Sequence, residues 1–248
     1  MTPQDCLRQH PLLGATTNGE VQELLRGLRT RRVEAGGVVF RKDDPGDGLY
    51  FVTRGRILIV AESADGRELI LNAHDPGELF GEIALLDGAG RSATAVAYEP
   101  SEVGCLGRDR FLSFIKARPE AMIRMVALLC GRLRRSTELV EDSAFLDFPT
   151  RLAKLVLTLL DGKAIHPGTG THPGADAPAT LKLTQRDLAL MLGVSREFVG
   201  KTLALWREAG MVEIGRRRLE ILDMPALERV VVGSAAGRSR LAKKSSWM

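Results

Sequence analysis

The apolar pattern of this chain changes near its middle, and that change limits the folds it can adopt. From Val33 to Leu106, short apolar stretches alternate with clusters of Gly, Pro and Asp. Many short strands separated by such turns are typical of an antiparallel sandwich or barrel. From Arg108 to about Phe145 the apolar residues recur at helical spacing instead. The sequence therefore predicts an α+β chain in which an antiparallel β domain precedes a long helix.

The long helix carries a regular apolar stripe. Its members are spaced 4, 3, 4, 3 and 4 residues apart, which is the a/d pattern of a coiled coil: Met122, Val126, Leu129, Leu133, Ser136 and Val140. A helix that lies on the core of its own domain could show the same stripe. The polar step at Ser136-Thr137 favours a dimer interface, because a core helix would stay apolar there. We therefore expect a homodimer.

The remaining segments are assigned by composition and periodicity. Residues 1–30 are expected to be helical, as are residues 146–160, whereas residues 163–180 are rich in Gly, Pro, Thr and Ala and are expected to form an exposed loop. Residues 181–224 are expected to be compact and residues 233–248 to be a frayed, basic tail. The expected division is 1–107 (β domain), 108–146 (dimerisation helix and hinge), 147–232 (winged helix-turn-helix) and 233–248 (tail).

The segment from Leu183 to Met211 has the pattern of a helix-turn-helix. Thr184 and Asp187 form a capping box that starts a short helix, and Gly193 occupies the turn, where a positive φ is needed. Ser195 can cap a second helix, whose inward residues are Val199, Leu203 and Trp206. Two short helices joined by a glycine turn suit DNA recognition. A helical hairpin that binds nothing has the same bare pattern.

Basic charge after the second helix favours DNA. Two apolar runs flank Gly215-Arg216-Arg217-Arg218, which predicts a hairpin wing with three arginines at its tip. Residues 1–148 hold 19 Lys+Arg and 22 Asp+Glu, a net charge of −3, whereas residues 149–248 hold 16 and 9, a net charge of +7. Without residues 237–248 the second segment is still +3. A basic C-terminal segment suits a polyanion partner.

A candidate anion site lies between Gly77 and Ala97. The backbone N–H groups where a glycine turn enters Glu82-Ile83-Ala84 can cradle an anion. Arg91 offers a bidentate fork for a phosphate, Ser92 adds a hydroxyl donor, and Glu82 could accept from a sugar hydroxyl. The plain alternative is a surface arginine that pairs with Glu82 beside a glycine turn.

Three segments resemble one family. FGEIALLDGAGRSATAVA resembles the phosphate-binding cassette of cyclic-nucleotide-binding domains, and SREFVGKTL resembles the recognition helix of the cyclic AMP receptor protein (catabolite activator) family of transcription regulators. AFLDFPTRLAKLVLTL resembles the hinge and first helix of that family's DNA-binding domain. The similarity runs from about residue 20 to about residue 224. It implies an N-terminal β-roll that binds the nucleotide, a long dimerisation helix and a C-terminal winged helix-turn-helix.

The resemblance also implies roles for individual residues. Gly81 and Glu82 would bind the ribose, Arg91 and Ser92 the cyclic phosphate, and Arg135-Ser136-Thr137 would meet adenine. Arg196, Glu197 and Lys201 would read bases, and Gln185, Arg186 and Ser195 would lie near phosphates. The family has arginine where this chain has Lys201, which lacks the bidentate fork. The family also has a small hydroxylic residue where this chain has Phe198. The family's loop that corresponds to residues 163–180 is shorter than the loop of this chain.

The implied protein is a regulator that binds a palindromic DNA site as a homodimer when cyclic AMP is bound, with RNA polymerase as a further partner. Cyclic GMP stays open as the effector, because only contacts to the purine edge distinguish the two nucleotides. A ligand-independent regulator is a further alternative, which the intact set of Glu82, Arg91 and Ser92 disfavours. A cupin-type enzyme would need clustered metal ligands, and the four histidines are scattered. An iron–sulfur sensor would need a cysteine cluster, and the three cysteines are far apart. We therefore expect no enzyme activity, no metal and no membrane contact, and a cytoplasmic location.

Overall fold

The computed structural model describes residues 26–64, 66–161 and 179–242, with side chains to residue 233, and five single residues before them: His10, Leu12, Gly19, Gln22 and Leu24. The chain folds into two compact units, Met1–Ser63 with Ile70–Arg135, and Ala64–Leu69 with Ser136–Met248. The expected loop at 163–180 lies almost entirely outside the described residues. Among the described residues, no helix is both long and apolar enough to cross a bilayer.

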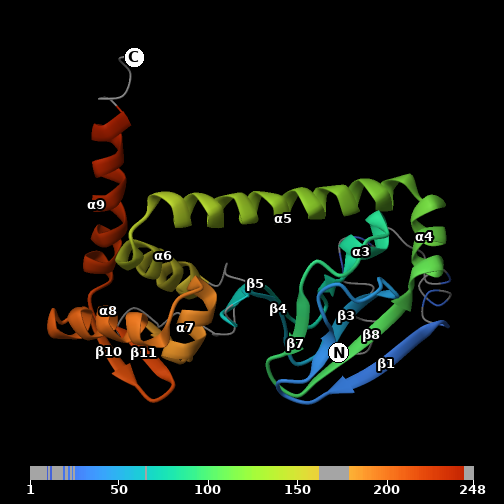
Figure 1. The fold of residues 1–248 in the computed structure, drawn as a ribbon, viewed down its shortest axis with the longest axis horizontal. Coiled ribbons are helices and arrows are strands. Elements are labelled where there is room, and N and C mark those ends of the chain that lie inside the picture. Colours follow the sequence, from blue (N-terminus) through green and yellow to red (C-terminus); the bar gives the residue numbers. More distant parts are fainter. Residues whose placement is uncertain are drawn as a thin grey trace. The chain divides into compact units, whose positions relative to one another are not determined.

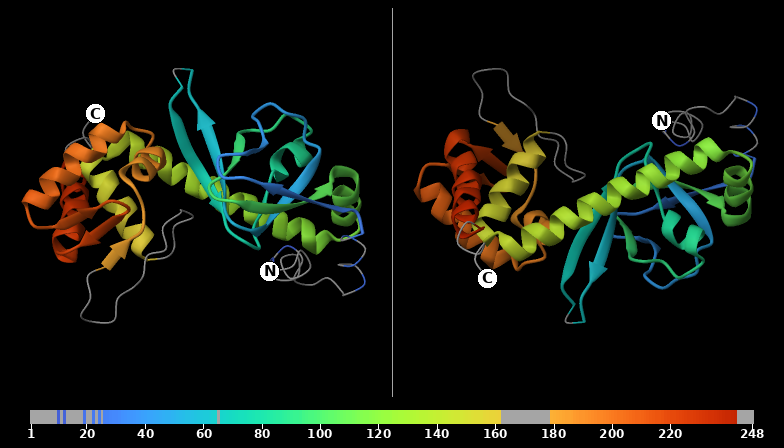
Figure 2. Two further views of the ribbon diagram at one scale, coloured as in Figure 1. Left: turned by 90° about the horizontal axis from the view of Figure 1, so that it is seen from below. Right: turned by 90° about the horizontal axis from the view of Figure 1, so that it is seen from above.

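The first unit is built on two antiparallel four-stranded sheets (Figures 1 and 2). One has the order β1-β8-β3-β6 and the other β2-β7-β4-β5. The strands are β1 (Leu28–Val33), β2 (Val38–Phe40), β3 (Gly48–Arg54), β4 (Ile57–Glu62), β5 (Glu68–His74), β6 (Leu79–Phe80), β7 (Thr94–Ala97) and β8 (Ser101–Gly107). The predicted antiparallel β domain is confirmed. The helical prediction for residues 1–30 is wrong at its end, because Leu28 pairs with Leu106 as the first residue of β1.

Helices α3 (Glu82–Asp87), α4 (Arg108–Lys116) and α5 (Pro119–Phe145) complete this part of the chain. Phe51 of β3 is fully buried, in one cluster with Phe111 of α4 and with Ala121 and Met125 of α5. The expectation of one helix from residue 108 is corrected by the break between α4 and α5. Pro119 lacks an amide hydrogen and disfavours a helical conformation in the residue before it, so a new helix begins there.

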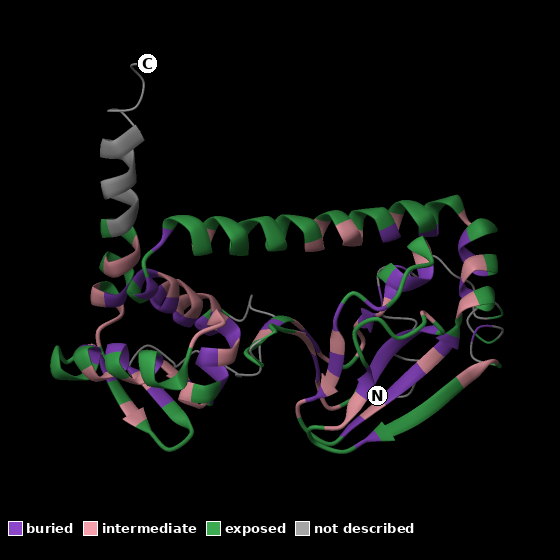
Figure 3. Ribbon diagram, in the orientation of Figure 1, coloured by how far each residue is buried: buried purple, intermediate pink, exposed green. Residues whose placement is uncertain are grey.

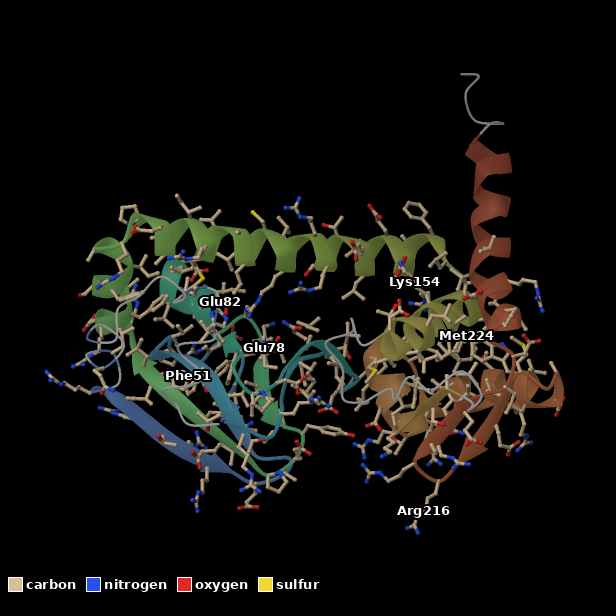
Figure 4. The ribbon with its side chains drawn as sticks, turned by 180° about the vertical axis from the view of Figure 1, so that it is seen from behind. Phe51, Glu78, Glu82, Lys154, Arg216 and Met224 are labelled. Carbon is tan, nitrogen blue, oxygen red and sulfur yellow. The ribbon has the colours of Figure 1, made fainter. Side chains whose placement is uncertain are left out.

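The described residues of the second unit form a three-stranded sheet of order β10-β11-β9 and four helices after the end of α5. Its elements are α6 (Phe148–Leu160), β9 (Ala179–Leu181), α7 (Gln185–Leu192), α8 (Arg196–Glu208), β10 (Val212–Gly215), β11 (Arg218–Ile221) and α9 (Met224–Ala242). Nζ of Lys154 donates to both carboxylate oxygens of Asp142, at 2.8 and 2.6 Å, which ties the end of α5 to α6 (Figure 4). The frayed tail expected from residue 233 is corrected as far as Ala242, where α9 ends, and the rest of that prediction, 243–248, lies outside the described residues.

Candidate functional site

The side chain of Arg91 is buried within the first unit. Arg91 follows α3 along the chain and is only 2% exposed. Its guanidinium carbon lies 4.2 Å from the centre of the Phe40 ring and 5.3 Å from the centre of the Tyr50 ring. Cation–π contact with these two aromatic rings therefore holds the guanidinium in place. Burial is the largest cause that raises the pKa of the Tyr50 hydroxyl.

The hydrogen bonds of Arg91 fix the plane of its guanidinium. Nη1 donates to the carbonyl oxygen of Gly81 at 2.7 Å, and Nη2 donates to Asp47 Oδ1 at 2.6 Å and to the carbonyl oxygen of Gly48 at 2.9 Å. Nε is buried and has no hydrogen-bond partner among the described residues. A buried cation with a free donor fits an anionic ligand. The plain alternative from the sequence, Arg91 paired with Glu82 at the surface, is wrong.

Gly81 is required by the geometry of this turn. It precedes the first residue of α3 with a φ of 80°, a left-handed conformation that favours glycine. A Cβ atom at this position would lie 2.6 Å from Nη1 of Arg91. Ala84 of α3 is buried, whereas Ile83 is exposed. The glycine therefore allows the cassette backbone to approach the arginine closely.

Glu82 is the second buried ionisable residue of the cassette. Its carboxylate forms an ion pair with Nη1 of Arg132 on α5 (Figure 4). Nη2 of Arg132 also donates to the carbonyl oxygen of Leu79 at 2.6 Å. Ala121 and Met125 on the same helix are buried in the core and mark its inward face. Arg132 lies about two turns after Met125 on that face.

Sequence reasoning missed Arg132 and Asp47, the two groups that hold Glu82 and Arg91. They lie 50 and 44 residues away from their partners along the chain. For Arg132 the spacing was a signal, since it lies 7 residues after Met125 and 11 after Ala121 and therefore on the same side of a helix. For Asp47 the turn cluster Asp43–Asp47 gave no indication of which carboxylate faces inward.

The remaining residues predicted for the nucleotide site are exposed. Ser92 is exposed directly beside the buried Arg91. Ser136 and Thr137 are exposed on α5 and belong to the second compact unit, whereas Glu82 and Arg91 belong to the first. The structure thus brings Gly81, Glu82 and Arg91 together within one unit.

The outward side of α5 is apolar and exposed along most of its length (Figure 3). We call the following residues, all exposed, the outer face of α5: Ile123, Val126, Cys130, Leu133, Thr137 and Val140. Their spacing is 3, 4, 3, 4 and 3, so they form a stripe of coiled-coil period. The stripe expected from the sequence is shifted by one residue at three positions, since Ile123, Cys130 and Thr137 stand in place of Met122, Leu129 and Ser136. Leu129 packs against the core of the first unit, whereas Met122 and Ser136 are exposed beside the outer face.

The helix-turn-helix has the predicted caps. Thr184 and Asp187 form a capping box, with Asp187 Oδ2 accepting from Thr184 N at 2.6 Å. Gly193 ends α7 with a φ of 63°, and Ser195 Oγ accepts from the amide of Phe198 at 3.3 Å. The predicted inward residues Val199, Leu203 and Trp206 are buried.

Close packing holds α7 on α8. A Cβ atom added to Gly200 would lie 3.2 Å from Oε1 of Gln185, so a larger residue there would have to displace the end of the Gln185 side chain. Gln185 itself is half-buried. The start of α8 and its neighbours present the other predicted DNA contacts to solvent: Arg186, Ser195, Arg196, Glu197 and Lys201.

The wing is confirmed as a hairpin, with one change at its tip. Val212 pairs with Ile221 and Gly215 with Arg218, so Arg216 and Arg217 form the turn, and Arg216 projects from it (Figure 4). Arg218 is the first residue of β11, and its Nη2 lies 2.9 Å from Glu220 Oε1. The tip therefore presents two arginines, and the third is paired on the strand.

Two histidines of the first unit lie in a shared electrostatic environment. His74 is buried, with its ring stacked on Phe80 and Nδ1 3.4 Å from Glu78 Oε2. Burial is the largest cause that lowers the pKa of His74, and burial lowers the pKa of His10 to about 4.

Within the described ranges, no group of three His, Cys, Asp or Glu residues is placed to hold a metal ion.

Two family models match the chain. The cyclic nucleotide-binding domain matches residues 30–118, and the Crp-like helix-turn-helix domain matches residues 150–230. The first range contains Gly81, Glu82 and Arg91, and the second contains α7, α8 and the wing. The two models therefore match the parts of the chain that contain the two candidate sites.

Relatives extend over most of the chain. The CRP-like cAMP-activated global transcriptional regulator of Mycobacterium tuberculosis is 33% identical over 209 residues, which cover 84% of this chain and 91% of that protein. The cyclic AMP receptor protein of Thermus thermophilus is 31% identical over 229 residues, 92% of this chain and all of that protein.

Solved structures show the same fold. The c-di-GMP-responsive global regulator CLP of Xanthomonas campestris superposes with a TM-score of 0.70 at 24% identity, covering 84% of this chain and 100% of that one. A family model matches each half of the chain, and relatives above 30% identity match nearly its whole length. The chain therefore belongs to the CRP/FNR family of transcription regulators, which are not enzymes, and combines a cyclic nucleotide-binding domain with a Crp-like helix-turn-helix domain.

Proposed function

We propose that this regulator binds cyclic AMP and, in that state, binds a palindromic DNA site as a homodimer. The observation that carries the proposal is the buried guanidinium of Arg91, which is held on Phe40 and keeps Nε without a partner in the part of the chain that the structure describes. Arg91 and Ser92 would hold the cyclic phosphate. Gly81 and Glu82 would hold the ribose, with the amides of Ile83 and Ala84 nearby. The relatives named above as cAMP-activated support cyclic AMP as the effector.

The DNA part of the proposal rests on the second unit. Arg196, Glu197 and Lys201 would contact base edges, while Gln185, Arg186, Ser195 and the wing residues Arg216, Arg217 and Arg218 would contact phosphates. Two recognition helices related by a two-fold axis need half-sites about one helical turn, roughly 34 Å, apart. The family resemblance implies a TGTGA-like half-site and a contact with RNA polymerase. The β domain at 1–107, the dimerisation helix and hinge at 108–146 and the start of the DNA-binding domain at residue 147 remain part of this proposal.

Cyclic GMP is the second candidate effector. Both nucleotides share the cyclic phosphate and the ribose, so Arg91, Ser92, Gly81 and Glu82 would serve either of them. Ser136 and Thr137, which are exposed hydroxyl donors and acceptors on α5, would supply contacts to the purine edge that distinguish the two.

Calorimetric titration with cyclic AMP and cyclic GMP tests the effector. The variant Arg91→Ala should lose about 2–5 kcal/mol of binding free energy, because it removes a buried charged donor. Arg91→Lys keeps the charge without the fork and should lose less. Arg29→Ala, which removes an exposed arginine from β1 of the same unit, is the matched control. Thermal unfolding of each variant shows whether it is folded. Wild-type affinity in a folded Arg91→Ala protein would refute the assignment.

Fluorescence anisotropy tests the DNA part. A labelled duplex with a TGTGA-like palindrome is titrated with the protein at physiological salt, with and without saturating cyclic AMP. We expect tighter binding with the nucleotide and weak binding to a scrambled duplex. Equal affinity for the two duplexes would overturn the proposal.

A further inference from the structure

One aromatic side chain in the recognition helix is not part of the core of its own unit. Phe198 is the third residue of α8 and is 47% exposed. The inward face of the same helix is made by Val199, Leu203 and Trp206, which are all buried. An apolar ring that is left half in water at the start of a recognition helix has surface available for a ligand.

The ring of Phe198 is held in place by a second aromatic ring. Its centroid lies 4.4 Å from that of Phe148, the buried first residue of α6, with 34° between the ring planes. The backbone of Phe198 is also fixed, since its amide donates to Ser195 Oγ and its carbonyl oxygen accepts from Thr202 Oγ1, both at 3.3 Å. A ring fixed in this way loses little conformational freedom when it binds.

The chemistry of the ring limits what it can contact on DNA. A phenyl group neither donates nor accepts a conventional hydrogen bond, so it cannot replace a hydroxyl that binds a phosphate. Polar base edges and charged phosphates would lose hydration against it. The apolar group that the major groove offers is the C5-methyl of thymine, and Phe is among the residues that read it.

We propose that Phe198 is a specificity-determining residue that reads a thymine by contact with its C5-methyl group in each half-site. The exposed Arg196, Glu197 and Lys201 surround it on the same first two turns of α8 and would bind the polar edges of the adjacent bases. This proposal rests on the proposed DNA binding. It specifies the base that Phe198 contacts, thymine, and the group on that base, the C5-methyl.

Replacing thymine by deoxyuridine tests the contact, since that change removes the methyl group and nothing else. The probe is a duplex enriched from a random library by the wild-type protein with cyclic AMP, in which each thymine is replaced in turn at symmetric positions. At one position we expect wild-type affinity to fall about fourfold per half-site, which corresponds to about 0.8 kcal/mol for one buried methyl group. In Phe198→Thr, whose single methyl group offers much less apolar surface than the ring, the same replacement should lower affinity less than in the wild type.

Leu205→Thr is the matched control, because Leu205 is an exposed apolar residue two turns further along α8. It should keep the full response to deoxyuridine. Phe198→Leu keeps apolar bulk and should keep part of the response, which tests the idea even if Phe198→Thr is unstable. If no position responds in the wild type, the ring contacts the sugar–phosphate backbone instead and the proposal is wrong. If Phe198→Thr responds like the wild type, another residue reads the methyl group. Failure to enrich any duplex would refute DNA binding itself.

Discussion

Asp47 Oδ1 lies 2.6 Å from Nη2 of Arg91, so the buried arginine of the phosphate-binding cassette has a carboxylate partner from the turn before β3. Arg91 is buried, whereas the Asp47 side chain is 65% exposed. The pair therefore joins a desolvated cation to an anion at the edge of the pocket. A ligand phosphate would add a second negative charge beside the same guanidinium.

Asp47→Asn should lower the thermal stability of the first unit and increase the stabilisation that bound nucleotide provides. Loss of the counter-charge should cost about 1–3 kcal/mol, toward the lower end because Asp47 is mostly exposed. The phosphate would then supply the missing anion, so saturating cyclic AMP should raise the melting temperature by more than in the wild type. Differential scanning fluorimetry with and without cyclic AMP measures both effects. Glu62→Gln, at an exposed position on β4, is the control, and an equal or smaller nucleotide gain in Asp47→Asn would contradict the prediction.

Two leucines of α5 should respond differently to charge. Leu133 is 68% exposed on the outer face of α5, so Leu133→Asp should yield a folded monomer if this face is the dimer interface. Leu129 packs against the core of the first unit, so Leu129→Asp should unfold that unit instead. Light scattering and circular dichroism separate the two results. A folded dimer of unchanged mass for Leu133→Asp would show that the interface lies elsewhere.

Ser136 and Thr137 should couple nucleotide binding to DNA binding. Replacing both by Ala leaves Arg91 and Glu82 intact, so cyclic AMP should still bind, more weakly. The nucleotide-induced gain in DNA affinity should shrink, because the coupling is a difference in ligand affinity between two states, typically about 1–3 kcal/mol. DNA affinity is measured with and without saturating nucleotide at fixed salt. A double variant that keeps the whole gain would place the switch in another part of the protein.

The wing arginines should differ in their effect on salt dependence. Arg216 and Arg217 form the hairpin turn, so replacing either by Ala should reduce the slope of log affinity against log salt by about one. Arg218 is paired with Glu220, so Arg218→Ala should change the slope less and serves as the comparison. Anisotropy titrations at several salt concentrations give the slopes. Identical slopes for all three variants and the wild type would exclude the wing from phosphate contact.

Acid should destabilise the first unit through His10. Burial lowers its pKa from 6.5 to about 4, so between these values the unfolded chain binds the proton and the folded chain does not. The stability is therefore fully present above pH 6.5 and is lost as the pH falls toward 4. His10→Asn should flatten this dependence in thermal unfolding between pH 4.5 and 7. The variant should retain some slope, because burial also lowers the pKa of His74. A slope unchanged from the wild type would count against a buried His10.

The sequence alone determined the elements and the two candidate sites. Strand and helix periods, the capping box at Thr184, Gly193 and the wing arginines all depend on neighbours within a few residues, so local rules identify them. The same local rules failed at element ends. Leu28 belongs to β1 because it pairs with Leu106. A pairing with a strand so far away in the sequence cannot be predicted from the residues next to Leu28.

Only the tertiary structure decided how the charged groups are paired and which helix faces are covered. Asp47 reaches Arg91, and Arg132 reaches Glu82, through packing between segments that lie 44 and 50 residues apart. The apolar stripe of α5 is visible in the sequence, but Leu129 packs against the core of the first unit and not on the expected dimer face. Periodicity gives the spacing of a stripe and does not identify its packing partner. Burial of a charge and the direction of a helix face are properties of the packed core, and they exist only once distant segments meet.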